Sequence, residues 1–151
     1  NGAEVGLTLI KSGIEPNPDS DNEEHVFTYA LLPHAGTWRD AGTPAEAEAL
    51  NQPLFAVRGG QAGERFGFAA TGAKNVVLET VKRAERGDGV VLRLYENSNA
   101  RTRTRITLAD APARAWDCDL LENPQGALAV EGRDILVELL PYEIKTVLVE
   151  F

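Results

Sequence analysis

Two apolar runs, Val76-Val-Leu-Glu-Thr-Val81 and Val90-Val-Leu-Arg-Leu-Tyr95, stand on either side of the segment Arg86-Gly87-Asp88-Gly89. Both runs are short and rich in β-branched residues, which is typical of strands. The Asp-Gly pair tolerates the positive φ angles of a tight turn. Strict alternation places Leu92 and Leu94 on one face of the second run. The sequence therefore predicts that the two runs form a hairpin.

Similar runs, separated by turn residues such as Asn97 to Ala100, recur along the chain. Several short strands at this spacing with Gly-rich and Pro-rich turns indicate an all-β sandwich. The further predicted strands are Val5–Ile10, His25–Leu32, Arg103–Leu108, Ala115–Leu121, Ile135–Leu140 and Ile144–Phe151.

One short helix is predicted after Gly42. Thr43 and Glu46 form a capping box with Thr43 as N-cap, and Pro44 suits the first helical position. Residues 45–50 have good helix propensity, and Pro53 ends the helix. It spans about two turns, so we expect a connector between β structures.

Glycine is concentrated in residues 58–72, which we interpret as a linker. The expected organisation is therefore residues 1–57, a linker over 58–72, and a terminal sandwich over 73–151. The chain begins with Asn1 and contains no Met, so we expect a piece of a longer protein.

Composition excludes several classes of protein. The chain has 151 residues and a formal net charge of −8, so it repels phosphate backbones, and we expect no nucleic-acid partner. No apolar run approaches the roughly 20 residues of a membrane span. Cys118 is the single cysteine, which rules out an internal disulfide and fits a reducing, cytoplasmic compartment.

An acidic loop is the best candidate for a functional surface, either an interface or part of an active-site rim. It departs from the EF-hand template because Glu24 replaces the required Gly and Ala30 replaces the bidentate Glu. A looser calcium site and a simply solvated loop both stay open. The candidate residues are Asp19, Asp21, Glu23, Glu24 and His25.

Three arginines, Arg101, Arg103 and Arg105, alternate along one predicted strand, about 7 Å apart. Such a stripe could bind an anion, but more often it pairs with acidic residues of a neighbouring strand, here Asp117 and Asp119.

Alternation puts Trp116, Cys118 and Leu120 on the face opposite those aspartates. We therefore expect Cys118 and Trp116 in the core. No sequence pattern points to a catalytic, cofactor-binding or metal-binding residue.

Six blocks of the sequence resemble, in order, the C-terminal region of the α-mannosidases of glycoside hydrolase family 38. The first block is preceded by Leu9-Ile-Lys-Ser12 and Pro18-Asp19. The blocks are His25–Trp38, Ala49–Leu54, Val81–Glu85, Val91–Glu96, Leu120–Asn123 and Leu140–Thr146.

The resemblance implies a retaining exo-α-mannosidase whose N-terminal catalytic domain holds zinc, the Asp nucleophile and the acid. The motifs of that domain are absent from this sequence, so no catalytic or metal residue is carried over and no cofactor is expected in this chain. The resemblance implies that residues 1–57 end a large β supersandwich and that a small β-sandwich follows.

Three functions follow from this reading. The first is a non-catalytic accessory domain that braces the catalytic domain of its parent and assists homo-oligomerisation, with mannose-containing glycans reached through the parent. The second is an autonomous carbohydrate-binding module, for which only Trp38 would be left as an aromatic platform. The third is a purely structural interaction domain.

Overall fold

The computed structural model describes residues 4–60, 63 and 65–151, and the chain divides into two units, Asn1–Ala41 and Gly42–Phe151. Within the described residues no helix has both the length and the apolar character needed to cross a membrane. The elements are α1 (Thr43–Asn51), β1 (Ala69–Thr71), β2 (Val76–Arg83), β3 (Val90–Glu96), β4 (Thr102–Leu108), β5 (Arg114–Cys118), β6 (Pro124–Ala127), β7 (Val130–Glu131), β8 (Asp134–Leu139) and β9 (Ile144–Glu150).

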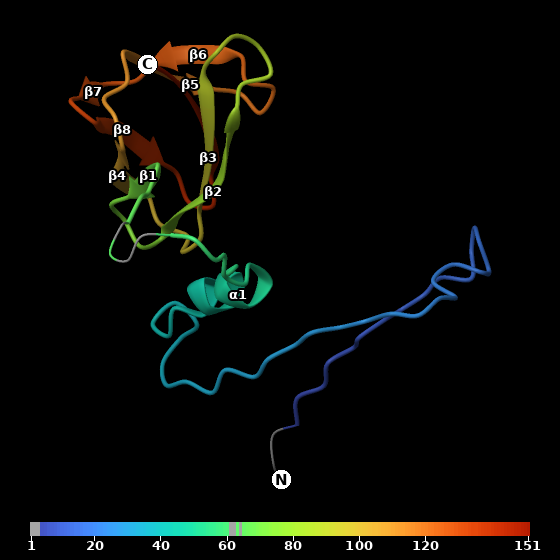
Figure 1. Cartoon of the computed structure of the whole chain (residues 1–151). Helices are drawn as coiled ribbons and strands as arrows, with labels where there is room; N and C mark the ends of the chain where they lie inside the picture. Colours follow the sequence, from blue (N-terminus) through green and yellow to red (C-terminus); the bar gives the residue numbers. More distant parts are fainter. Residues whose placement is uncertain (1–3, 61–62, 64) are drawn as a thin grey trace. The chain divides into compact units, whose positions relative to one another are not determined.

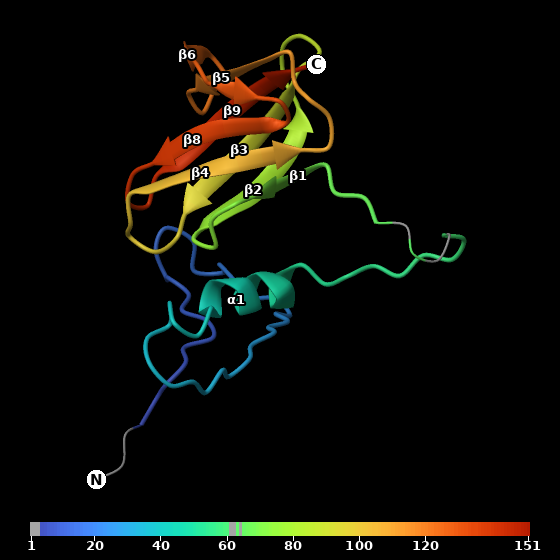
Figure 2. The same ribbon diagram turned by 90° about the vertical axis from the view of Figure 1, so that its left-hand side faces the viewer.

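The strands of the second unit form a two-layer sandwich. A four-stranded sheet has the order β1-β4-β8-β7, and a five-stranded sheet has the order β2-β3-β9-β5-β6. All strand pairs are antiparallel. Figure 1 shows the two sheets facing each other, and Figure 2 shows the four-stranded sheet in front. The predicted all-β sandwich with one short helix is confirmed.

The core lies between the two sheets and follows from the period-two alternation of the strands. Leu92 and Leu94 of β3 share a face, as predicted, and both are fully buried. They pack against inward side chains of both sheets. The buried core consists of Val76, Leu92, Leu94, Ile106, Leu108, Ala115, Ile135, Val137, Leu139, Val147 and Val149.

The predicted hairpin is also confirmed, because β2 pairs with β3 from Val76↔Glu96 to Arg83↔Val90. Gly87 has φ 75° in the connecting turn. A Cβ at Gly89 would lie 2.7 Å from Leu148 Cδ1 and 3.0 Å from the backbone oxygen of Val149, so a larger residue there would force the Leu148 side chain to move. The turn 97–100 joins β3 to β4, which belong to different sheets, so it is a crossover between layers.

The predicted strands Val5–Ile10 and His25–Leu32 are wrong, because residues 4–41 contain neither helix nor strand. Their apolar side chains face solvent, with Val26 and Leu31 each 87% exposed. An alternating segment becomes a strand only when its backbone groups find a ladder partner. The acidic loop, like the rest of residues 4–41, lies outside helix and strand.

The helix is confirmed, but its predicted cap is wrong. Gly42, with φ 65°, is the N-cap, and no side chain caps the helix. The Gly42 carbonyl accepts the first hydrogen bond of the helix, from Ala45 N at 2.9 Å. Thr43 therefore lies inside the helix, where its Oγ1 is buried without a hydrogen-bond partner.

Two further boundaries differ from the sequence reading. Strand β1 lies within the proposed linker and pairs with β4, so residues 69–71 belong to the sandwich. Strand β5 ends at Cys118, and the chain then makes a tight turn. The short strands β6 and β7 were not predicted, because their residues lack an alternating apolar pattern.

Candidate functional site

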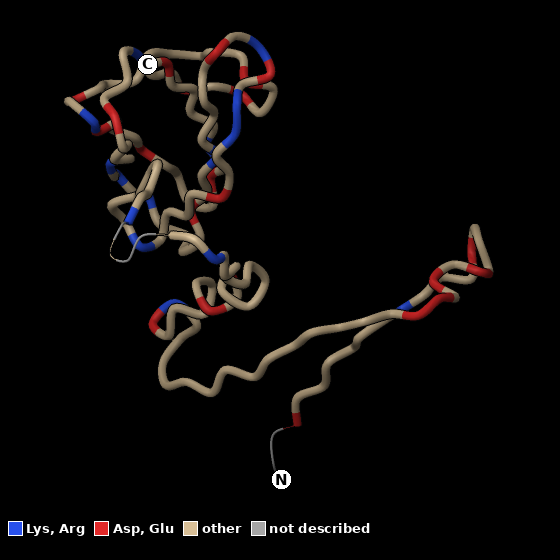
Figure 3. Tube along the Cα trace, viewed as in Figure 1, with Lys and Arg blue, Asp and Glu red and all other residues tan. Residues whose placement is uncertain are grey.

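The acidic loop is exposed throughout its five candidate residues (Figure 3, red). His25 Nε2 hydrogen-bonds the carbonyl oxygen of Asp21 at 2.9 Å, and its ring stacks on Phe27 with centroids 6.0 Å apart. Among the described residues, no group of three or more His, Cys, Asp or Glu could hold a metal ion. The geometry here is that of a solvated acidic surface, and its role stays a prediction.

The arginine stripe lies on the outward face of the four-stranded sheet. Arg103 Nε is 2.5 Å from Glu138 Oε2, and Arg101 Nε is 2.5 Å from the other oxygen of the same carboxylate. Arg105 faces Asp134 at 3.6 Å. The stripe therefore pairs with acidic residues, as expected, but the predicted partners Asp117 and Asp119 are wrong.

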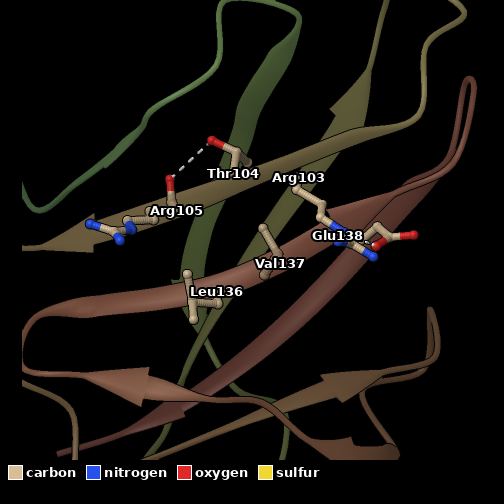
Figure 4. Close-up of a pocket in the computed structure, with 6 residues that line it drawn as sticks. All are labelled: Arg103, Thr104, Arg105, Leu136, Val137 and Glu138. Atoms are coloured by element: carbon tan, nitrogen blue, oxygen red, sulfur yellow. Dashed lines mark hydrogen bonds and ion pairs between the residues drawn. The ribbon is translucent and has the colours of Figure 1, made fainter.

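The paired charges flank an open hollow of about 370 Å³ on strands β4 and β8. Figure 4 shows Leu136 and Val137 beside the arginines, with Glu138 meeting Arg103. Hydrogen bonds from Arg103 and Arg101 hold the pKa of Glu138 below its usual value. Because each guanidinium of the stripe already faces a carboxylate, the hollow does not present the unpaired positive charge of an anion site.

The face of strand β5 that points into the core is the opposite of the predicted one. Its inward residue is Ala115, which belongs to the core, so Trp116 and Cys118 point away from the core. Cys118 is nevertheless buried on this outer side, and burial raises the pKa of its thiol. Trp116 is half-buried, with the Arg114 guanidinium 5.1 Å from its ring centroid.

Asp117 consequently points into the sandwich, where it meets a buried lysine. Lys145 is 8% exposed, and its Nζ lies 3.1 Å from Asp117 Oδ2 and 3.0 Å from Glu143 Oε1. Burial lowers the pKa of Lys145, but the two carboxylates outweigh it and raise the pKa above its usual value. This ion cluster explains why Asp117 cannot serve the arginine stripe.

The turn after β5 crosses the outward face of the five-stranded sheet. The Leu120 carbonyl accepts a hydrogen bond from Arg93 Nη2 at 3.2 Å. Glu122 accepts from the backbone N of Glu85 at 2.8 Å and lies 2.8 Å from Lys82 Nζ. The turn thus reaches from β5 over β9 and β3 to the end of β2. It explains why Thr146, on this outer face, is only 1% exposed.

A buried carboxylate joins three loops at one end of the sandwich. Glu96 is 2% exposed and accepts hydrogen bonds from Asn75 Nδ2 at 2.8 Å, Ser98 N at 2.7 Å and Tyr142 N at 3.0 Å. Burial by itself raises the pKa of Glu96, but these bonds and one from Ala100 outweigh it and set the pKa to about 2. Tyr142 takes φ 58° in this arrangement.

The last four blocks quoted above therefore meet in space. Block 91–96 contacts block 120–123 through Arg93 and block 140–146 through Glu96, and block 81–85 contacts block 120–123 through Lys82. Sequence reasoning quoted these blocks but assigned no role to Glu96, Lys145 or Glu122. Their only sequence signal was membership of the blocks, because period-two reading treats an acidic or basic residue as solvated.

The comparisons with known proteins point to one family. Residues 75–147 match the model of the glycosyl hydrolases family 38 C-terminal beta sandwich domain. Residues 75–147 belong to the C-terminal beta sandwich domain of glycosyl hydrolase family 38. The match runs from the residue before β2 into β9, so it covers most of the sandwich described here.

Curated relatives of this family 38 domain match almost the whole chain. Alpha-mannosidase 2C1 of Homo sapiens is 33% identical over 97% of the chain and 15% of its own length. The Mus musculus protein of the same name is 32% identical over 95% and 14%, and alpha-mannosidase G of Dictyostelium discoideum is 27% identical over 96% and 14%. The chain thus spans about 15% of the length of the curated relatives it matches.

Proposed function

We propose that this chain is the non-catalytic C-terminal accessory domain of a retaining exo-α-mannosidase that hydrolyses terminal α-mannosides. The carrying observation is that the chain, which contains a family 38 C-terminal sandwich, aligns over nearly its whole length with about one seventh of the length of each curated α-mannosidase that it matches. The interactions described above hold the sandwich together, which suits a domain that braces its neighbour.

In this proposal the catalytic domain of the parent supplies the chemistry. Zinc, the nucleophile and the acid would be held there, and mannose-containing glycans would be bound there. The parent would act in the cytoplasm, and the accessory domain would assist its oligomerisation.

The first test is turnover of an aryl α-mannoside by the purified 151-residue chain, with and without added zinc. We expect no turnover, because the reaction needs a nucleophile and acid that the resemblance places in the catalytic domain. The parent enzyme serves as positive control. Turnover by the chain that persists through repeated purification and is lost on adding a chelator would contradict the proposal.

A second candidate function, sugar binding by the sandwich itself, gains one observation. Trp116, expected in the core, lies half-buried on the outward face, so the sandwich carries an aromatic ring outside its core. Aromatic faces are common platforms for sugars. Titration of the chain with mannose and mannobiose, followed by tryptophan fluorescence, would separate this function from a purely structural one.

A further inference from the structure

The outward face of the five-stranded sheet carries more apolar side chains than that of the opposite sheet, on either side of Arg93 and Thr146. The strands β3, β9 and β5 direct apolar side chains away from the core, and the turn 119–123, bonded to Arg93 of β3 through the Leu120 carbonyl, adds two exposed leucines. We call this surface the apolar face. It consists of Tyr95, Trp116, Leu120, Leu121, Ile144 and Leu148.

Three members of the apolar face are open to solvent. Leu121 is 80% exposed, Leu120 60% and Ile144 57%, while Tyr95, Trp116 and Leu148 are half-buried. Exposed single leucines are ordinary, but several gathered on one sheet face mark an interaction surface. A solvated antiparallel sheet face would instead carry polar side chains at these positions.

The two leucines are held outward by a closely bonded turn. Asp119 Oδ1 accepts hydrogen bonds from the backbone N of Leu121 and of Asn123, both at 2.9 Å. Asn123 Nδ2 donates to Asp119 Oδ2 at 2.9 Å. Glu122 takes φ 67° between them. A turn fixed in this way presents its leucines already ordered, which lowers the entropy cost of docking.

The charged side chains of this face, Lys82 near its edge and Arg93 at its centre, are both held by contacts within the domain. Lys82 contacts Glu85 and Glu122, and Arg93 donates to the Leu120 carbonyl. Lys82 already has two carboxylate partners, so a protein surface that covers the leucines would not leave its charge unpaired.

We propose that the apolar face docks the accessory domain onto the remainder of its own parent α-mannosidase chain. This inference rests on the proposed function. The human relative extends far beyond the matched segment, which is 15% of its length, so most of such a parent lies outside this chain. Blocks 81–85, 91–96, 120–123 and 140–146, which carry the family resemblance, build the apolar face or its border.

The test uses the full-length parent enzyme with Leu120→Ser and Leu121→Ser combined. Removing two leucines from a docked surface should weaken docking by on the order of ten-fold or more. We expect proteolysis between the accessory domain and the rest of the enzyme to become faster by a similar factor. The thermal unfolding of the accessory domain should separate from that of the catalytic domain.

Two further variants make the result specific. Ile144→Thr keeps a β-branched residue in β9, so it tests the apolar face without disturbing the strand. Arg103→Ser with Arg105→Ser changes two exposed side chains on the opposite sheet and should leave both measurements unchanged. Circular dichroism should show the β signal of the parent in every variant.

Several outcomes would overturn the inference. Unchanged proteolysis and unfolding in both apolar-face variants would do so. Loss of a dimer on light scattering, with unchanged proteolysis, would assign the face to a second copy of the chain. A change in Trp116 fluorescence when mannose is added to the full-length enzyme, with docking unaffected by the leucine variants, would assign the apolar face to sugar binding.

Failure of the proposed function would be recognised separately. If deleting residues 42–151 left the parent enzyme's activity and stability unchanged, the accessory role itself would be wrong. If that deletion inactivated or destabilised the enzyme while the leucine variants did not, only the docking face would be wrong.

Discussion

Residues 4–41 and the sandwich carry the same kind of sequence pattern, yet only the sandwich forms strands. His25–Leu32 has apolar residues on both of its predicted faces, as the buried strand β9 does. In β9, hydrogen bonds to β3 and β5 satisfy both edges of the backbone. Residues 4–41 form no ladder, and their apolar side chains face solvent. A β-type sequence pattern therefore forms a strand only where a partner strand pairs with it.

The largest expected effect tests this contrast with a matched pair of leucines. Leu94→Ala removes a fully buried side chain, and it should lower the free energy of unfolding by about 2–5 kcal/mol. Leu31→Ala removes a side chain that is 87% exposed, and it should change stability by less than about 0.5 kcal/mol. Urea denaturation of the 151-residue chain measures both. A substantial loss in Leu31→Ala would show that residues 4–41 pack in solution.

The second effect concerns Glu96, whose carboxylate binds loops of the sandwich together. Its folded pKa of about 2 is below its ordinary value of 4.5. A depressed carboxyl pKa stabilises the fold above about pH 4.5, and that stability is lost as the pH falls toward about 2. The full contribution is about 3 kcal/mol at neutral pH.

Glu96→Gln should therefore destabilise the chain at pH 7 and flatten the decline of stability between about pH 4.5 and pH 2. Denaturation curves at several pH values measure this. Glu138→Gln, in the exposed pair with Arg101 and Arg103, is the control and should have a smaller effect. Equal pH profiles for the parent chain and Glu96→Gln would contradict the role given to Glu96.

The smallest effect is expected in the acidic loop. Asp19→Ser, Asp21→Ser and Glu23→Ser combined should leave the fold of the 151-residue chain intact, because all three side chains are exposed. In the parent enzyme the same change should lower activity or loosen docking if the loop contacts a basic surface. Kinetics and thermal unfolding of the full-length variant measure this. Unchanged values in both would leave the loop as a solvated surface.

The faces of the two sheets show why part of the candidate site could not be predicted. Alternation correctly grouped Trp116 with Cys118 and separated them from Asp117. It could not say which group points inward, because a period of two is symmetric between the faces. The choice was made by Lys145, whose buried ammonium draws Asp117 inside, and by the small Ala115, which fills the core.

The sequence by itself determined the family, the sandwich class, the hairpin of β2 and β3 and the short helix. It also indicated that the arginine stripe pairs with acidic residues of a neighbouring strand. Each depends on neighbours along the chain or on a recognisable block. Only the tertiary structure decided which acids meet those arginines, which side of β5 is buried, and that residues 4–41 form no strand. These outcomes depend on contacts between residues far apart in sequence, such as Arg103 with Glu138 and Lys145 with Asp117, and local periodicity carries no information about them.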